Sequence, residues 1–255
     1  MKQSRHNRVL EMLAERGSLT VAEIAEALRV SAMTVRRDLD ELSTAGLLRR
    51  QHGGATQNIG RAYEPPFRLR ADRQTADKES IGKAAAAMVR PGDAIGFDVG
   101  STALSVAEAL ETTNITVVTA SLRVATTIAS RFALERDLRV VLVGGVLRSD
   151  ELSLVGGMAD AALSGLRLDR AFIGVGGLSV SEGATEFSME DALVKRRLVQ
   201  ISDKVVVVAD HTKFGEVALC HVCGTTEIDA IVTDAAAPED DVRALRDLGV
   251  EVEQV

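Results

Sequence analysis

The sequence has few of the residues that mark secreted, membrane-spanning or aromatic-rich proteins. Its 255 residues include two cysteines, four prolines, one tyrosine and no tryptophan. Two cysteines cannot build a disulfide framework in a chain of this length, which indicates a reducing compartment. No run approaches 18 consecutive apolar residues, and the first residues lack the apolar stretch of a signal peptide. We therefore expect a cytoplasmic protein with no membrane segment.

The net charge of −7 is unevenly distributed along the chain. Residues 1–56 hold nine Lys and Arg against seven Asp and Glu, a net charge of +2, which leaves −9 for the remainder. This asymmetry predicts that any nucleic-acid surface lies in the first fifth of the chain. Because +2 is a modest charge for binding DNA, we expect several copies of this region to bind together in a homo-oligomer.

Local signals predict a short helix that begins after Thr20. Thr20 and Glu23 have the spacing of a capping box, in which each side chain accepts a hydrogen bond from the backbone amide of the other residue. Leu19 and Ile24 have the spacing of a hydrophobic staple. The apolar periodicity ends near Arg29, so a turn is expected there.

A second helix is predicted to begin after Ser31, a favourable N-cap residue near which a phosphate could bind. Val35, Leu39 and Leu42 form its apolar stripe. At 100° per residue, the side chains that turn outward or to the flank, and that we predict to contact DNA, are Met33, Thr34, Arg36 and Arg37. Arginine can donate two hydrogen bonds to guanine, and Thr and Met can touch a thymine methyl, so this face suits a major groove.

In this second helix the basic residues precede the acidic residues. Asp38, Asp40 and Glu41 follow the arginines. We therefore expect the helix to enter a groove by its N-terminal end, with the acids further away.

After Gly46, a predicted helix-ending glycine, residues 47–55 have the pattern of a basic hairpin. Gly53 and Gly54 can make a tight turn. The side chains that we predict to lie along a phosphate backbone are Arg49, Arg50 and His52. With the two helices, the hairpin predicts a winged helix-turn-helix domain over residues 1–57 that binds double-stranded DNA. The alternative is a helical hairpin whose arginines are only solvated.

This region also resembles a known family. The matching pattern is Val30-Ser31, Thr34-Val35-Arg36-Arg37-Asp38-Leu39, Leu42, Gly46, Leu48, Arg50 and His52-Gly53-Gly54-Ala55. It is similar to the N-terminal signature of the DeoR family of bacterial sugar-metabolism regulators. The resemblance implies a transcriptional regulator that binds operator DNA, with repression as the expected direction of control.

The remainder of the chain is predicted to be one larger domain behind a linker. Residues 58–77 are mixed and polar and contain the chain's only Pro-Pro pair, which predicts the linker. From Lys78 onward, helical and strand patterns alternate. Strands such as residues 205–208 are apolar throughout, as in parallel strands that are covered on both faces. We therefore predict an α/β effector domain with a doubly wound parallel sheet over residues 78–255.

Small and polar residues follow several of the predicted strands. Residues 98–102, Asp-Val-Gly-Ser-Thr, lead from a strand into a helix, where free amides and two hydroxyls can hold an anion. Thr119-Ala120-Ser121, Gly144-Gly145, residues 174–177 and Asp210 with Lys213 follow other strands. Ligands of such sheets bind beyond the carboxyl ends of the strands, so these residues predict a pocket for an anionic ligand.

Residues 78–234 also resemble the sensor domain of DeoR-type regulators, which is similar in fold to ribose-5-phosphate isomerase. The resemblance implies a phosphorylated sugar as the ligand, with residues 100–102 near the phosphate and Lys195 and Lys213 supplying positive charge. The predicted effector-binding residues, from the strand ends and the matching motifs, are Asp98, Gly100, Ser101, Thr102, Thr119, Ser121, Gly144, Gly145, Asp169, Gly176, Glu182, Lys195, Asp210 and Lys213.

Two positions depart from the pattern of these relatives. Ala120 stands where the family commonly has Asn, which leaves the recognition of the sugar's hydroxyl groups open. Val194 stands where the isomerases have a Glu directly before the Lys, and a valine cannot accept a proton. We therefore expect a domain that binds its sugar phosphate without turning it over. Carboxylates that could still act as a substitute base are Glu186, Glu190 and Asp191.

Other functions remain open from the sequence alone. An isomerase-like enzyme with a DNA-binding appendage fits the pattern, and so does a sensor of another anionic metabolite or of a protein partner. Cys220 and Cys223 have metal-like spacing, but one C-x-x-C lacks the second pair of a structural zinc site. We expect buried, reduced thiols there, and neither a metal nor a cofactor.

Overall fold

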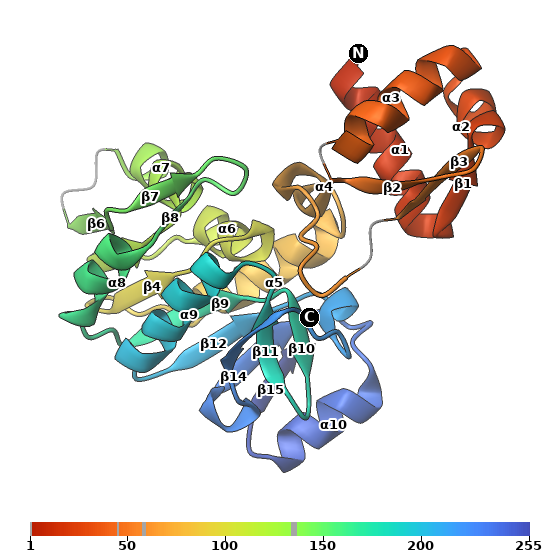
Figure 1. Cartoon of the computed structure of the whole chain (residues 1–255). Coiled ribbons are helices and arrows are strands. Elements are labelled where there is room, and N and C mark those ends of the chain that lie inside the picture. The colour runs from red at the N-terminus through yellow and green to blue at the C-terminus, as the bar shows by residue number, and fades with distance from the viewer. Residues whose placement is uncertain (1, 45, 58–59, 134–136) are drawn as a thin grey trace. The chain divides into compact units, whose positions relative to one another are not determined.

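The computed structural model describes residues 2–44, 46–57, 60–133 and 137–255 and divides the chain into two compact units (Figure 1). The first unit is Met1–Pro65 and the second is Pro66–Val255. The second half of the expected linker therefore belongs to the larger unit. No helix within the described residues is long and apolar enough to cross a membrane.

The described part of the first unit folds as three helices and a three-stranded antiparallel sheet. The helices are α1 (Lys2–Arg16), α2 (Val21–Leu28) and α3 (Ala32–Thr44). The strands are β1 (Ser18–Thr20), β2 (Leu48–Gln51) and β3 (Gly54–Gln57), in the spatial order β1-β3-β2. The predicted helix-turn-helix with a hairpin wing is confirmed, and β1 is a strand that the sequence pattern did not indicate.

The capping signals of α2 form the contacts that the sequence predicts. The Thr20 hydroxyl accepts a hydrogen bond from the Glu23 amide at 3.2 Å, and the Glu23 carboxylate accepts one from the Thr20 amide at 2.7 Å. Leu19 and Ile24 are both buried. Arg29 follows the helix with a φ of 52°, a left-handed conformation that ends α2 and lets α3 begin at once.

The second unit is built on a seven-stranded parallel sheet. In spatial order its strands are β15 (Glu251–Gln254), β14 (Ala230–Thr233), β12 (Val205–Val208), β9 (Arg170–Gly174), β4 (Ala94–Phe97), β5 (Ile115–Thr119) and β6 (Leu138–Leu142). Each neighbouring pair is parallel. All of β12 is buried, as expected of a strand that is covered on both faces.

Helices cover both faces of this sheet, which confirms the predicted α/β architecture. On one face, buried side chains of α5 (Thr75–Ala87), α6 (Ser101–Ala109) and α7 (Leu122–Arg131) form an apolar cluster with Phe97 and Phe172. On the other face, buried side chains of α8 (Gly157–Ser164), α9 (Met189–Ile201) and α10 (Glu239–Asp247) pack with Ile173 and Val207. The rings of Phe97 and Phe172 stack with centroids 5.3 Å apart.

Two smaller sheets were not indicated by the sequence pattern. One is the antiparallel hairpin of β7 (Val146–Arg148) and β8 (Ser153–Val155), and the other is the antiparallel sheet of β10 (Gly177–Ser179), β11 (Gly183–Glu186) and β13 (Cys220–Cys223). The Leu154 amide of β8 donates to the carbonyl of Ala120, just after β5. The β7–β8 hairpin therefore borders the edge of the main sheet at which its strands end.

Candidate DNA-binding surface and ligand site

The first turns of α3 present the side chains that were predicted to contact DNA. Ser31 caps the helix by accepting a hydrogen bond from the Thr34 amide at 3.1 Å. Met33 is 72% exposed, the Arg37 side chain is 79% exposed, and Arg36 is exposed as well. A hollow of about 260 Å³ lies beside Met33, Thr34 and Arg37. One open face thus offers guanidinium, hydroxyl and thioether groups, which is the chemistry that contacts base edges.

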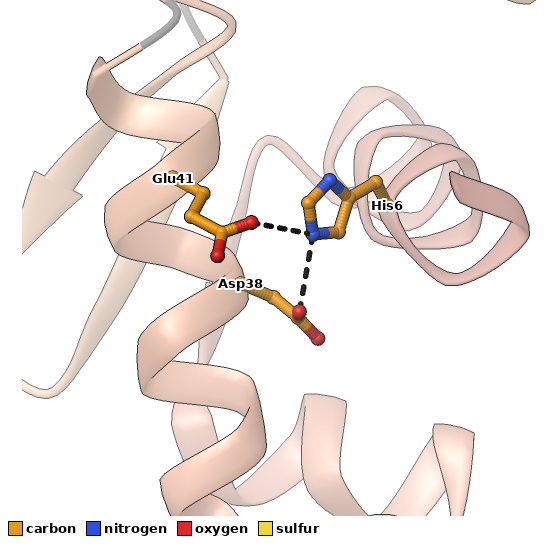
Figure 2. A group of neighbouring side chains, drawn as sticks. All are labelled: His6, Asp38 and Glu41. Carbon is orange, nitrogen blue, oxygen red and sulfur yellow. Dashed lines mark hydrogen bonds and ion pairs between the residues drawn. The ribbon is translucent and has the colours of Figure 1, made fainter. Parts of the chain in front are cut away.

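One acid of α3 lies inside the unit rather than with the exposed acids. Asp38 is 1% exposed and accepts hydrogen bonds from Arg5 Nη2 at 2.8 Å and from His6 Nε2 at 3.0 Å, both on α1. His6 also lies 3.6 Å from the Glu41 carboxylate (Figure 2). The hydrogen bond from Arg5 holds the pKa of Asp38 below its usual value, against the opposing effect of burial. Asp38 therefore fastens α1 to α3.

This cluster has the residue types of a metal site but not the electrostatics. The ligand atoms of His6, Asp38 and Glu41 all lie within 4.8 Å of one another. However, the Arg5 guanidinium already donates to both carboxylate oxygens of Asp38. A metal ion there would meet a fixed positive charge, so the arrangement fits an ion-pair network better than a metal centre.

The hairpin of β2 and β3 is tied to α3 through one of its arginines. Arg50 Nη1 donates to the Gly54 carbonyl at 3.1 Å, and Arg50 Nε lies 3.1 Å from the Asp40 carboxylate. Arg49 and His52 are exposed. Arg50 therefore helps to hold the hairpin against α3, although it is exposed like Arg49 and His52.

In the second unit, a buried ion pair lies at the carboxyl ends of the central strands. Asp98 follows β4 and Lys195 extends from α9, and their side chains are 1% and 2% exposed. Lys195 Nζ also donates to the Gly174 carbonyl at 2.9 Å, and the Gly174 amide donates to Asp98 at 3.0 Å. The Glu186 carboxylate, at the end of β11, lies 3.1 Å from Lys195 Nζ. One ammonium therefore joins β4, β9, β11 and α9.

These buried charges alter one another's protonation. Burial raises the pKa of Asp98 to about 6, and the attraction of Lys195 opposes that shift. Burial would lower the pKa of Lys195, but Asp98 and Glu186 outweigh it and raise that pKa above its usual value. Burial would raise the pKa of Glu186, but Lys195 and the Phe187 amide hold it below its usual value. Lys195 is thus a fixed positive charge.

Residues 100–102 form the turn at the N-terminus of α6. Gly100 has a φ of 105°, a conformation that is strained for residues with a side chain. Ser101 and Thr102 are both 8% exposed. The start of a helix presents free amides and the positive end of the helix dipole. A Cβ atom on Gly100 would lie 3.8 Å from a guanidinium nitrogen of Arg70. The turn therefore lies beside a cation, so an oxyanion held by its amides would meet positive charge.

Cations from three elements gather on this side of the site. Arg70 of α4 (Phe67–Ala71) pairs with the buried carboxylate of Glu151, in the β7–β8 turn. Lys78 of α5 donates to the backbone carbonyl of Arg70. Burial lowers the pKa of Lys78 to about 8, and Asp210 opposes the shift. Burial also lowers the pKa of Lys213, in the 3₁₀ helix η1 (His211–Lys213), again with Asp210 opposing.

Several predicted site residues are engaged in contacts within the fold. The Thr119 hydroxyl donates to the last carbonyl of β4 at 2.8 Å, and the Ser121 hydroxyl accepts from an amide in the first turn of α7 at 3.2 Å. A Cβ atom on Gly145 would lie 2.7 Å from the β8 backbone. These contacts shape the strand ends. Ligand contact remains a prediction for Thr119, Ser121, Gly144, Gly145 and Gly176.

Two predicted residues lie away from this edge and are corrected. Asp169 precedes β9 and accepts a hydrogen bond from the Ala94 amide at 2.7 Å, at the start of β4. It therefore stands at the amino ends of the parallel strands, opposite the edge at which the ligand was predicted. Glu182 is exposed in the turn before β11, whereas Glu186 at the other end of that strand reaches Lys195. The motif match identified both segments of the chain, but not the end of the neighbouring strand at which each side chain lies.

Sequence reasoning missed several residues of the site, among them Lys78. Arg70 lies in the stretch that was expected to be linker, and Arg148 and Glu151 lie in a hairpin with no strand pattern. Arg148 reaches from β7 to the buried carboxylate of Asp191, at the start of α9. The sequence feature that could have indicated Arg70 was the cluster of arginines over residues 68–73, which directly precedes an acidic domain.

Cys220 and Cys223 are buried free thiols in β13. Burial raises the pKa of the Cys223 thiol to about 12. His221, between them, is exposed. A thiol that keeps its proton is a poor nucleophile and a poor metal ligand, so the arrangement fits packing rather than reactivity.

Both units match models of one protein family. Residues 5–59 match the DeoR-like helix-turn-helix domain, and residues 73–235 match the DeoR C terminal sensor domain. The chain is 33% identical over 255 residues to the glycerol-3-phosphate regulon repressor of Escherichia coli (strain K12), covering 99% of each chain. It is also 33% identical over 238 residues to the lactose phosphotransferase system repressor of Staphylococcus aureus (strain NCTC 8325 / PS 47), covering 91% of this chain and 92% of that protein. A solved structure of ribose 5 phosphate isomerase A from Neisseria gonorrhoeae is 20% identical, with a TM-score of 0.39 over 54% of this chain and 52% of that chain.

Proposed function

The chain belongs to the DeoR family of transcriptional regulators, and we propose that it represses sugar-metabolism genes and loosens its hold on operator DNA when it binds a phosphorylated sugar. The observation that carries the choice of ligand is the turn of residues 100–102, which opens α6 and faces Arg70. The names of two relatives, a glycerol-3-phosphate regulon repressor and a lactose phosphotransferase system repressor, support a ligand of this class.

The DNA half of the proposal assigns different tasks to α3 and the wing. The exposed N-terminal turns of α3 enter the major groove, where Arg36 and Arg37 contact base edges. Arg49 and His52 follow the phosphate backbone. Because the first 56 residues carry a net charge of only +2, two or more copies bind one operator, as a homo-oligomer in the cytoplasm.

The phosphate of the ligand binds at the start of α6. The amides and hydroxyls of residues 100–102 donate to its oxygens, as helix N-termini do in other anion sites. Arg70, Lys78 and Lys213 supply positive charge around it. Charge-assisted hydrogen bonds of this kind are about twice as strong as neutral ones, so the free sugar binds much more weakly than its phosphate.

Arg70 lies close in the chain to the DNA-binding unit, so a ligand that contacts it can act on that unit. Its helix, α4, begins at Phe67, one residue after the boundary between the units at Pro65 and Pro66. The ring of Phe67 lies 3.9 Å from the Arg123 guanidinium carbon, and Lys78 holds a carbonyl of the same helix. A phosphate that competes for Arg70 and Lys78 changes how α4 is held, and hence the segment that leads to the winged helix.

The sensor unit binds its ligand without converting it. Aldose–ketose isomerisation needs a base beside the reacting carbon, and Val194 offers none. Glu186, whose carboxylate lies 3.1 Å from Lys195 Nζ, has a lowered pKa and is therefore a weaker base than usual. We expect no interconversion when the protein is incubated with pentose and hexose phosphates and followed by NMR. Turnover that disappears in Glu186→Gln or Glu190→Gln would identify an enzyme instead.

A thermal-shift screen of sugar phosphates beside their free sugars tests the proposal. A ligand present at 100 times its Kd adds about 2.7 kcal/mol of stability, which raises the melting temperature of the sensor unit measurably. We expect at least one phosphate to stabilise the wild type and to lose that effect in a variant that carries Thr102→Val and Lys213→Gln. A free sugar that stabilises as strongly as its phosphate would contradict the assignment.

A further inference from the structure

In the second unit, three of the buried side-chain oxygens that have no hydrogen-bond partner within the described residues come from segments that contact one another. They are Asp98 Oδ1, Ser153 Oγ and Asp191 Oδ1, and the three residues are 1%, 0% and 2% exposed. The second oxygen of each aspartate is engaged, by Lys195 for Asp98 and by Arg148 for Asp191. Buried polar atoms almost always have a partner, so each of these oxygens is an acceptor for which a hydrogen-bond donor is expected.

The three side chains come from separate elements that meet at this point. β4, which ends beside Asp98, pairs with β5, and Ser153 of β8 forms a bridge just beyond the end of β5. Arg148 and Ser153 are register partners in the β7–β8 hairpin, so their side chains lie on the same face. Arg148 then reaches Asp191. Asp191 stands one turn before Lys195 in α9, on the same face of that helix.

The surrounding charges restrict what can bind to these oxygens. The two aspartates repel a second anionic group. Lys195 and Arg148 lie beside the same carboxylates and repel an ammonium group. A neutral hydroxyl group satisfies both conditions, because it donates one hydrogen bond and carries no charge. Two carboxylates and a serine can together accept from several hydroxyls on one carbon chain.

We propose that Asp98, Ser153 and Asp191 form the hydroxyl-recognition end of the ligand pocket, and that the effector carries neighbouring hydroxyl groups remote from its phosphate. The inference rests on the proposed function, which places the phosphate at residues 100–102. Ala120 is 1% exposed and offers no polar side-chain atom, so the β7–β8 hairpin and α9 supply the discrimination between ligands. The effector class is thus a phosphorylated polyol or sugar whose vicinal hydroxyls determine its affinity.

Calorimetry with the full-length protein tests this assignment. The probes are glycerol 3-phosphate, ribose 5-phosphate, fructose 6-phosphate and glucose 6-phosphate, and then each monodeoxy analogue of the tightest binder. We expect the loss of one critical hydroxyl to weaken binding to the wild type by about 10-fold to 100-fold, as for hydrogen bonds to charged groups. In Asp191→Asn and Ser153→Ala, the ratio between the affinities of the parent ligand and its deoxy analogue falls towards one. Removing the ligand hydroxyl and removing its protein partner delete the same hydrogen bond, so their effects are not additive.

Asp160→Asn is the matched control for Asp191→Asn. It removes the carboxylate partner of Arg197, which lies in α9 on a different face of that helix from Asp191. This variant should keep the wild-type ratio. Ser153→Ala removes no charge and keeps the test decisive if Asp191→Asn does not fold.

Two results would overturn the inference in different ways. If a phosphate binds but every monodeoxy analogue binds equally well, or if the two variants keep the wild-type ratio, the hydroxyl assignment fails and the phosphate site stands. If none of the four phosphates binds the wild type, the proposed function fails and takes the hydroxyl assignment with it.

Discussion

The two units use charge in opposite ways. In the winged-helix unit the arginines predicted to meet DNA are exposed, with the Arg37 side chain at 79%, whereas in the sensor unit Lys195 is 2% exposed and surrounded by carboxylates. Exposed charges contribute little to folding stability, while a buried charge that loses its partner is costly. The proposed DNA surface can therefore change without unfolding the protein, whereas the proposed ligand site is also part of the core.

The largest expected effect is on the stability of the sensor unit. Lys195→Met leaves Asp98 and Glu186 buried without their counter-charge, and should lower the free energy of unfolding by about 3–5 kcal/mol. Urea denaturation followed by circular dichroism measures it. Arg37→Ala should change the same quantity by less than about 0.5 kcal/mol. Equal effects of the two substitutions would remove the contrast between the units.

The next effect is on DNA specificity. Arg37→Ala should weaken binding to the operator by about 1–3 kcal/mol relative to random duplex, because an arginine that contacts a base edge is lost. Arg49→Ala should weaken binding to both duplexes alike and flatten the salt dependence, as expected of a phosphate contact. Fluorescence anisotropy on both duplexes at several salt concentrations separates the two. If Arg49→Ala changes the ratio of the two affinities and Arg37→Ala does not, the assigned roles are reversed.

A smaller effect is a pH dependence that only the sensor unit should show. Burial lowers the pKa of Lys78 to about 8, so the ammonium that we propose to attract a phosphate is present below that pH and is lost above it. Ligand affinity should therefore fall above pH 8, by up to about tenfold per pH unit. Lys78→Arg keeps its charge over this range and should abolish the fall. An unchanged pH profile in Lys78→Arg would show that another group titrates.

The smallest effect concerns the local signals of the winged helix. Thr20→Ala removes the N-cap of α2, while its capping-box partner Glu23 keeps its side chain. The variant should lose about 1 kcal/mol of unfolding free energy in the first unit alone. Thermal unfolding of the wild type and Thr20→Ala measures the difference in unfolding free energy, with ligand present to stabilise the sensor unit. A loss that appears in the sensor transition would contradict the assignment of this cap to the stability of the first unit alone.

The same contrast explains which features the sequence could predict. Helix caps such as Thr20 with Glu23, and parallel strands such as residues 205–208, depend on neighbouring residues and were recognisable from spacing alone. The pairing of Lys195 with Asp98, and of Arg70 with Glu151, joins residues far apart in sequence, and no local pattern encodes it. Motif matching placed Asp169 and Glu182 in the predicted site, although they lie away from it. A motif identifies the segment but not the end of the strand at which a side chain lies.

The most direct test of the account measures operator affinity with and without ligand. An operator selected from random duplex is titrated with the full-length protein in the presence of the stabilising sugar phosphate, of its free sugar, or of neither. We predict that the phosphate weakens operator binding at least tenfold, that the free sugar has no effect, and that Thr102→Val with Lys213→Gln removes the response without changing ligand-free affinity. Unchanged affinity at a phosphate concentration that saturates the sensor unit would contradict the claim that the buried anion site controls the exposed DNA surface.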